Sequence, residues 1–157
     1  MALLRRSRIC FVTGLLGLSL GAATAALADT KLDAGRALWE KAALSSYEYG
    51  YRKFCECHRD SPPETVVSVR DGKVFRVRHR PADSPVEVPA DAKNLGYYWT
   101  VEGLFDLVES ALERGVEVRV AYDAALGYPR EIYIDYDRDF IGDELDVRLT
   151  AVTPLAP

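Results

Sequence analysis

The residues best suited to chemistry are two cysteines one residue apart, with a histidine directly behind them. Cys55 and Cys57 flank one glutamate, and His58 follows. Thiolates form and exchange disulfides and bind soft metals. In a regular strand the two Cβ atoms would lie about 6.6 Å apart along the chain, whereas a disulfide needs them about 3.8 Å apart. A disulfide between Cys55 and Cys57 therefore requires the backbone to bend.

A soft-metal site is a second interpretation of the same segment. If the neighbouring strands pair as their turns suggest, Cys57 lies opposite Glu64, and Glu64 lies opposite His79. Cys55, Cys57, His58 and His79 would then meet at one corner of a sheet, with the sulfur and nitrogen ligands that suit Cu(I) or Zn²⁺. A structural disulfide, a redox-active pair and a metal site all stay open. No cofactor is expected, and Cu, Zn or Ca are the alternatives.

An acidic segment, residues 135–146, is the candidate for calcium. Asp135, Asp137, Asp139 and Asp143 match positions 1, 3, 5 and 9 of an EF-hand loop. Phe140 stands where that loop needs glycine, and a predicted strand rather than a helix leads into the segment. An irregular Ca²⁺ loop therefore competes with a solvated acidic connection whose charges protect the strands from aggregation.

Two stripes of side chains are candidates for binding without catalysis. Arg76 and Arg78 alternate on one face of a predicted strand and are suited to an anion or a carboxylate. Tyr47, Tyr49 and Tyr51 share one face of another strand. Such tyrosines form either a ligand platform or part of the core. The arginines, likewise, are either a binding site or a solvated face.

The first 28 residues have the pattern of an export signal. Three arginines lead into an apolar run from residue 9 to about residue 20, and Ala26 and Ala28 stand where a signal peptidase cleaves. An uncleaved anchor is the alternative, because the apolar stretch is nearly long enough to span a membrane. We predict cleavage before Asp29, a periplasmic or secreted location, and no stable membrane anchor afterwards.

Removing the signal changes the charge and the cysteine count. Residues 1–28 contain three arginines, no acid and Cys10, so residues 29–157 carry 17 basic against 24 acidic residues, a net charge of −7. This balance argues against nucleic acid as a partner. The remaining 129 residues are enough for one domain with a single core.

The hydrophobic pattern predicts an α+β fold in a single domain, residues 29–157. Helical spacing favours helices over 30–44 and 100–115, and a Pro-rich connection is expected over 81–99. Alternation predicts three strands after each helix, at 47–57, 64–70, 73–79, 116–122, 132–136 and 145–151. Short turns between neighbours favour two αβββ-like units that form a mostly antiparallel sheet of about six strands, with two helices on one face.

Four segments together resemble a family of bacterial exported proteins with a domain of unknown function. They are Tyr51-x-x-Phe54-Cys55-x-Cys57, the hairpin at 67–74, the helix TVEGLFDLVESAL and the hairpin YDAALGYPREIYIDYD. The resemblance implies an envelope or secreted location and includes the Cys-x-Cys pair in the family pattern. It implies no activity.

Sequences that mark common catalytic sites are absent, including nucleophile elbows, zinc-protease helices and phosphate or dinucleotide loops. We therefore expect a non-catalytic binding or interaction module whose partner is a protein or small molecule of the cell envelope. A thiol-redox or soft-metal protein that acts through Cys55 and Cys57 is the alternative, and an enzyme of unknown chemistry comes third.

Overall fold

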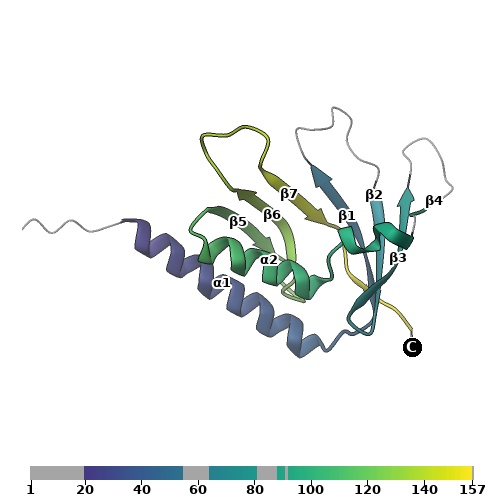
Figure 1. Ribbon diagram of the computed structural model, residues 1–157. Helices are drawn as coiled ribbons and strands as arrows, with labels where there is room; N and C mark the ends of the chain where they lie inside the picture. Colours follow the sequence, from purple (N-terminus) through teal and green to yellow (C-terminus); the bar gives the residue numbers. More distant parts are fainter. Residues whose placement is uncertain (1–19, 55–63, 81–87, 91, 157) are drawn as a thin grey trace, which may run out of the picture.

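A computed structural model describes residues 20–54, 64–80, 88–90 and 92–156 of the chain (Figure 1). Of residues 20–27 only the backbone is described. The elements follow in the order α1 (Leu20–Ala42), β1 (Tyr47–Phe54), β2 (Glu64–Arg70), β3 (Lys73–Arg80), β4 (Val88–Pro89), the 3-10 helix η1 (Ala92–Tyr97), α2 (Val101–Glu113), β5 (Glu117–Tyr122), β6 (Pro129–Asp135), β7 (Leu145–Leu149) and β8 (Thr153–Pro154).

The strands form one antiparallel sheet in which β1 joins the two halves of the chain. The order across the sheet is β4-β3-β2-β1-β7-β6-β5, and the short β8 also pairs with β1. Tyr51 pairs with Thr65 of β2 on one side and with Leu149 of β7 on the other. Each predicted αβββ unit therefore contributes three adjacent strands, and the units meet between β1 and β7.

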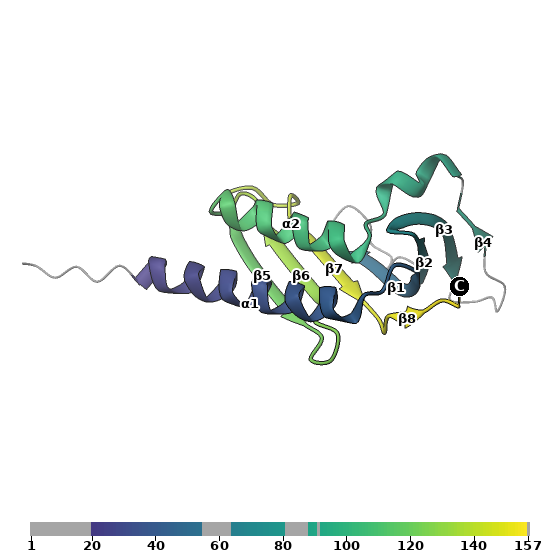
Figure 2. The ribbon, with the colours of Figure 1, turned by 90° about the horizontal axis from the view of Figure 1, so that it is seen from below.

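Both α-helices lie across the same face of this sheet (Figure 2). The buried side chains of α2 and of the sheet belong to one hydrophobic cluster, which also includes Leu32 and Trp39 of α1. The predicted α+β class, with two helices covering one face of a mostly antiparallel sheet, is confirmed. The opposite face carries no helix among the described residues, and we call it the open face.

The second helix begins and ends where its sequence predicts. The Oγ1 atom of Thr100 accepts a hydrogen bond from the backbone N–H of Gly103 at 3.1 Å, which caps the helix N-terminus. Gly115 follows the helix with φ of 70°, a conformation that glycine adopts without steric cost. The first helix differs from the expectation, because it starts at Leu20 rather than near residue 30. None of the described helices is long and apolar enough to cross a membrane.

The turn between β2 and β3 has the predicted form, but the register beyond it is shifted by one residue. Asp71 and Gly72 both have positive φ, 49° and 71°, as a type I′ turn requires. A bulge at Ser68/Val69 then places His79 opposite Thr65, and Glu64 opposite Arg80. The predicted pairing of Glu64 with His79 was wrong, because an ideal two-residue hairpin does not include the extra residue that the bulge inserts in β3.

Candidate functional site

The predicted thiol and soft-metal site falls largely outside the described residues. Cys55, Cys57 and His58 all lie in the segment 55–63, so the disulfide, redox and metal interpretations stay predictions. His79 is described, and its ring Nδ1 atom lies 3.2 Å from Oγ1 of Thr65, its cross-strand neighbour. This contact gives the histidine a partner within the sheet.

The acidic segment between β6 and β7 forms a loop that its own hydrogen bonds organise. The Asp137 carboxylate accepts a hydrogen bond from the backbone N–H of Asp139 at 3.1 Å. One carboxylate oxygen each of Asp135 and Asp143 is buried without a hydrogen-bond partner. Desolvation, followed by the nearby charge of Asp135, raises the pKa of Asp143. In the described part of the chain no three acidic, histidine or cysteine side chains are grouped to hold a metal, so the calcium loop stays a prediction.

Two arginines of the stripe on β3 bind one glutamate of β1. The Glu48 Oε1 atom accepts hydrogen bonds from Ser68 at 2.6 Å, Arg76 at 2.8 Å and Arg78 at 3.0 Å. Desolvation alone would raise the pKa of Glu48, but these hydrogen bonds and the two positive charges outweigh it and lower that pKa. Arg80 forms a similar pair with Glu64 at 3.1 Å. Both predicted anion-binding arginines are therefore already paired within the open face.

The tyrosine stripe of β1 belongs to the core. Tyr47, Tyr49 and Tyr51 are at most 4% exposed. The Tyr47 hydroxyl donates to the Glu102 carboxylate at 2.9 Å, and that carboxylate also accepts from the indole N–H of Trp39 at 2.8 Å. One half-buried carboxylate thus links α1, β1 and α2, and burial gives these tyrosines a structural role.

The other two tyrosines extend the same packed row. The Tyr49 hydroxyl donates to the backbone oxygen of Trp99, and the Tyr51 ring meets the rings of Tyr98 and Trp99 at 5.7 and 6.3 Å. Burial is the main cause that raises the pKa of each of the three stripe tyrosines, so all three hydroxyls stay neutral at physiological pH.

A different group of exposed and half-buried side chains gathers on the open face where β5, β6, β7 and the end of β1 lie side by side. The antiparallel register aligns Arg119, Tyr133, Asp146 and Phe54 in one row across these four strands. Their neighbours along each strand, such as Ile132 and Val147, are fully buried against the helices. Because side chains alternate between the faces of a strand, the row must lie on the open face.

Two arginines of this region stack on aromatic rings. The Arg119 guanidinium lies 4.1 Å from the ring centre of Tyr133, and that of Arg148 lies 5.0 Å from the ring centre of Phe54. Arg148 also pairs with Asp146 at 3.1 Å. The side chains of Arg119 and Arg148 remain 66% and 56% exposed, respectively. We call Phe54, Arg119, Tyr133, Asp146 and Arg148 the open-face cluster.

Four residues of the cluster, Arg119, Tyr133, Asp146 and Arg148, line a shallow hollow of about 330 Å³ on the sheet. Its lining also includes Ala121, whose small side chain leaves room beside Tyr133, and Glu131 at the side toward β7. Cations, acids and an aromatic surface therefore converge on one concavity. This arrangement holds no nucleophile with an adjacent base, and it is suited to recognition.

Sequence patterns contain part of the signal for this cluster. Alternation along β5, β6 and β7 places Arg119, Tyr133, Asp146 and Arg148 on the face opposite the apolar residues. Phe54 joins the cluster because β1 pairs with β7. These two strands are distant in the sequence, so no short turn between them predicts the pairing.

Comparison with known protein families assigns the chain to one family. Residues 31–154 match the family of unknown function DUF6174. The protein belongs to this family. The match covers nearly every described element, from the second half of α1 to β8. No match was found among curated proteins or among solved structures.

Proposed function

We propose that this member of the DUF6174 family is a non-catalytic binding module that holds a partner protein against its open-face cluster. The observation that carries the proposal is that two exposed arginines, each stacked on an aromatic ring, line one hollow of the open face. Arginine and tyrosine are the residue types that most often dominate the free energy of protein association.

The stacking also reduces the cost of binding. A long side chain that is fixed in one geometry on association loses about 0.5 to 1.5 kcal/mol of rotamer freedom. Arg119 already lies over Tyr133, and Arg148 is held both by Phe54 and by Asp146. The free protein therefore presents both guanidinium groups in a restricted arrangement.

The geometry also indicates the chemistry of the partner. A guanidinium has five N–H donors, and the Arg119 ion pair with Glu117 spans a long 3.8 Å. A carboxylate of the partner can form a closer, bidentate pair with Arg119. The hollow over Ala121 and Tyr133 accommodates an apolar or aromatic side chain. The export signal predicted in residues 1–28 leads us to propose that this recognition occurs in the periplasm or outside the cell.

The arginine stripe at the other end of the open face is a weaker candidate, because Arg76 and Arg78 are already paired with Glu48. The alternative function in thiol or soft-metal chemistry depends on Cys55 and Cys57 and stays a prediction.

Site-specific photo-crosslinking in the cells that make the protein tests the proposal. A photoreactive phenylalanine replaces Ala121 in the hollow, and in a control it replaces Glu113, which is exposed at the end of α2. We expect an adduct of discrete mass from position 121 and none of that mass from position 113. Absence of the adduct at position 121, or an equal yield from both positions, would overturn the proposal.

A matched pair of charge variants makes the test specific to the cluster. The double variant Arg119→Glu/Arg148→Glu reverses the two stacked cations, and Lys41→Glu/Lys73→Glu changes the net charge by the same amount at exposed positions elsewhere. The first variant is expected to abolish the adduct at position 121 and the second to leave it unchanged. Loss of the adduct in both variants would show that its formation depends on the net charge of the protein and not on the cluster.

A further inference from the structure

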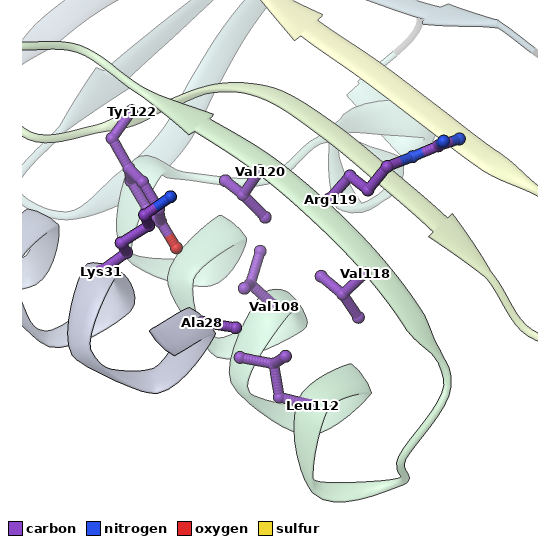
Figure 3. Close-up of a pocket in the computed structure, with 8 residues that line it drawn as sticks. All are labelled: Ala28, Lys31, Val108, Leu112, Val118, Arg119, Val120 and Tyr122. Atoms are coloured by element: carbon purple, nitrogen blue, oxygen red, sulfur yellow. The ribbon is translucent and has the colours of Figure 1, made fainter. Parts of the chain in front are cut away.

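A second cavity lies on the helix side of the sheet, at its free β5 edge. β5 pairs only with β6 among the described strands. Beneath it a cavity of about 350 Å³ opens between the middle of α1, the second half of α2 and the strand itself (Figure 3). This volume falls in the range of about 300 to 1,000 Å³ that is typical of small-molecule sites. The cavity is separate from the open-face cluster.

The walls of this cavity are aliphatic. Val108 and Leu112 come from α2, and Val118 and Val120 from β5. Val108 is buried in the core, whereas the other three are half-buried, although each is an apolar side chain. Protein interiors are normally packed with few voids larger than a water molecule. A hollow with these walls is therefore suited to an aliphatic occupant.

The polar groups of the cavity gather at one end. Figure 3 shows Lys31 and Tyr122 together at the end opposite Val118 and Leu112. Burial raises the pKa of Tyr122 to about 12, so its hydroxyl remains a neutral donor at physiological pH. The Arg36 charge partly offsets this rise in pKa and the Asp33 charge adds to it, but neither residue lines the cavity.

The remaining charged residue of the lining points elsewhere. Arg119 belongs to β5, but its guanidinium is directed to the open face, where it lies over Tyr133. Among the described residues of the lining, the Lys31 ammonium is thus the charge that the cavity presents, and none of them carries a carboxylate. If residues 1–28 are removed on export, α1 loses its first turns, including Ala28, and the other described lining residues remain.

We propose that this cavity binds a medium-chain carboxylate, with the aliphatic chain between α2 and β5 and the carboxylate at Lys31 and the Tyr122 hydroxyl. The ammonium and the phenol supply a charge and a hydrogen-bond donor for the two carboxylate oxygens. Burial of one methylene is worth about a fourfold change in affinity. Affinity should therefore rise by about fifteenfold from octanoate to decanoate and level off once the chain fills the cavity.

Nuclear magnetic resonance of the purified protein, carrying ¹³C-labelled valine and leucine methyl groups, tests this site directly. Decanoate is titrated at concentrations below its self-association. We expect saturable shifts that are confined to Val108, Leu112, Val118, Val120 and their contacts. Shifts that do not saturate, or that spread equally over core valines such as Val67, would overturn the proposal.

Two further comparisons separate the charged end from simple apolar binding. Lys31→Glu, at an exposed position of α1, should weaken decanoate at least tenfold, whereas the control Lys41→Glu on the same helix should not change its affinity. Decanol should bind the unmodified protein more weakly than decanoate does. Its affinity should be the same for Lys31→Glu and Lys41→Glu. Equal decanoate affinity in Lys31→Glu and the unmodified protein would overturn the assignment. A failure of partner cross-linking at position 121 leaves these results unaffected.

Discussion

The link between Glu102, Trp39 and Tyr47 allows a quantitative test of the fold that supports both proposed sites. The Glu102 carboxylate accepts from the Trp39 indole at 2.8 Å and from the Tyr47 hydroxyl at 2.9 Å. Glu102→Ala removes both hydrogen bonds and leaves two buried donors without an acceptor. Hydrogen bonds to charged groups contribute about 1.5 to 3 kcal/mol each.

The loss for each of the two hydrogen bonds is expected near the lower end of that range, about 1.5 kcal/mol, because Glu102 is only half-buried. We expect Glu102→Ala to lower the free energy of unfolding by about 3 kcal/mol. For urea slopes of about 1 to 3 kcal/mol per molar, the midpoint falls by about 1 to 3 M. Urea unfolding followed by tryptophan fluorescence and circular dichroism measures this shift.

A second glutamate on the same helix provides the matched control. Glu109 pairs with Arg36 at 2.9 Å, but its side chain is 53% exposed. Glu109→Ala should therefore change stability by at most about 1 kcal/mol. Glu102→Gln, which keeps an acceptor for Trp39 but removes the charge, should fall between the two. A loss in Glu102→Ala no larger than in Glu109→Ala would refute the assigned role of the Glu102 carboxylate.

Two further predictions concern the core tyrosines and one tight contact. Because burial raises the pKa of Tyr47, Tyr49 and Tyr51, the unfolded chain loses their protons first; stability is complete below pH 10 and falls above it by about 1.4 kcal/mol per pH unit for each tyrosine. Circular dichroism and the tyrosinate absorbance of these three buried side chains should then change together above pH 10, and their ionisation near pH 10 without unfolding would contradict this. Gly127→Ala should lower the melting temperature far more than the control Gly72→Ala. Both glycines have positive φ, but only at Gly127 would a Cβ lie 2.2 Å from a backbone oxygen of α1. Equal losses in the two variants would show that this close approach is absent.

Local sequence patterns were sufficient to predict most of the elements. The apolar stripe and the Thr100 cap defined α2, and the Asp71-Gly72 pair defined a hairpin whose turn has the predicted backbone. The structure confirms the two helices, the six longer strands and their assignment to one antiparallel sheet. These features depend on residues close together in the chain, where periodicity and turn chemistry act.

Features that depend on distant residues were not predictable in the same way. The bulge that moves His79 opposite Thr65 adds one residue to β3, and the Asp71-Gly72 turn does not specify that addition. Likewise, the pairing of β1 with β7, which adds Phe54 to the open-face cluster, joins strands about a hundred residues apart. The paired state of Arg76 and Arg78 also required a partner from another strand, Glu48.

The most direct test of the proposed function is the affinity of the cross-linked partner for the purified protein, measured by isothermal titration calorimetry. The cluster variant Arg119→Glu/Arg148→Glu should bind at least a hundredfold more weakly than the unmodified protein. The variant Lys41→Glu/Lys73→Glu, with the same change in net charge, should bind within about threefold of it, because charges outside an interface contribute little to affinity. Equal affinity of the cluster variant and the unmodified protein would contradict binding through the open face.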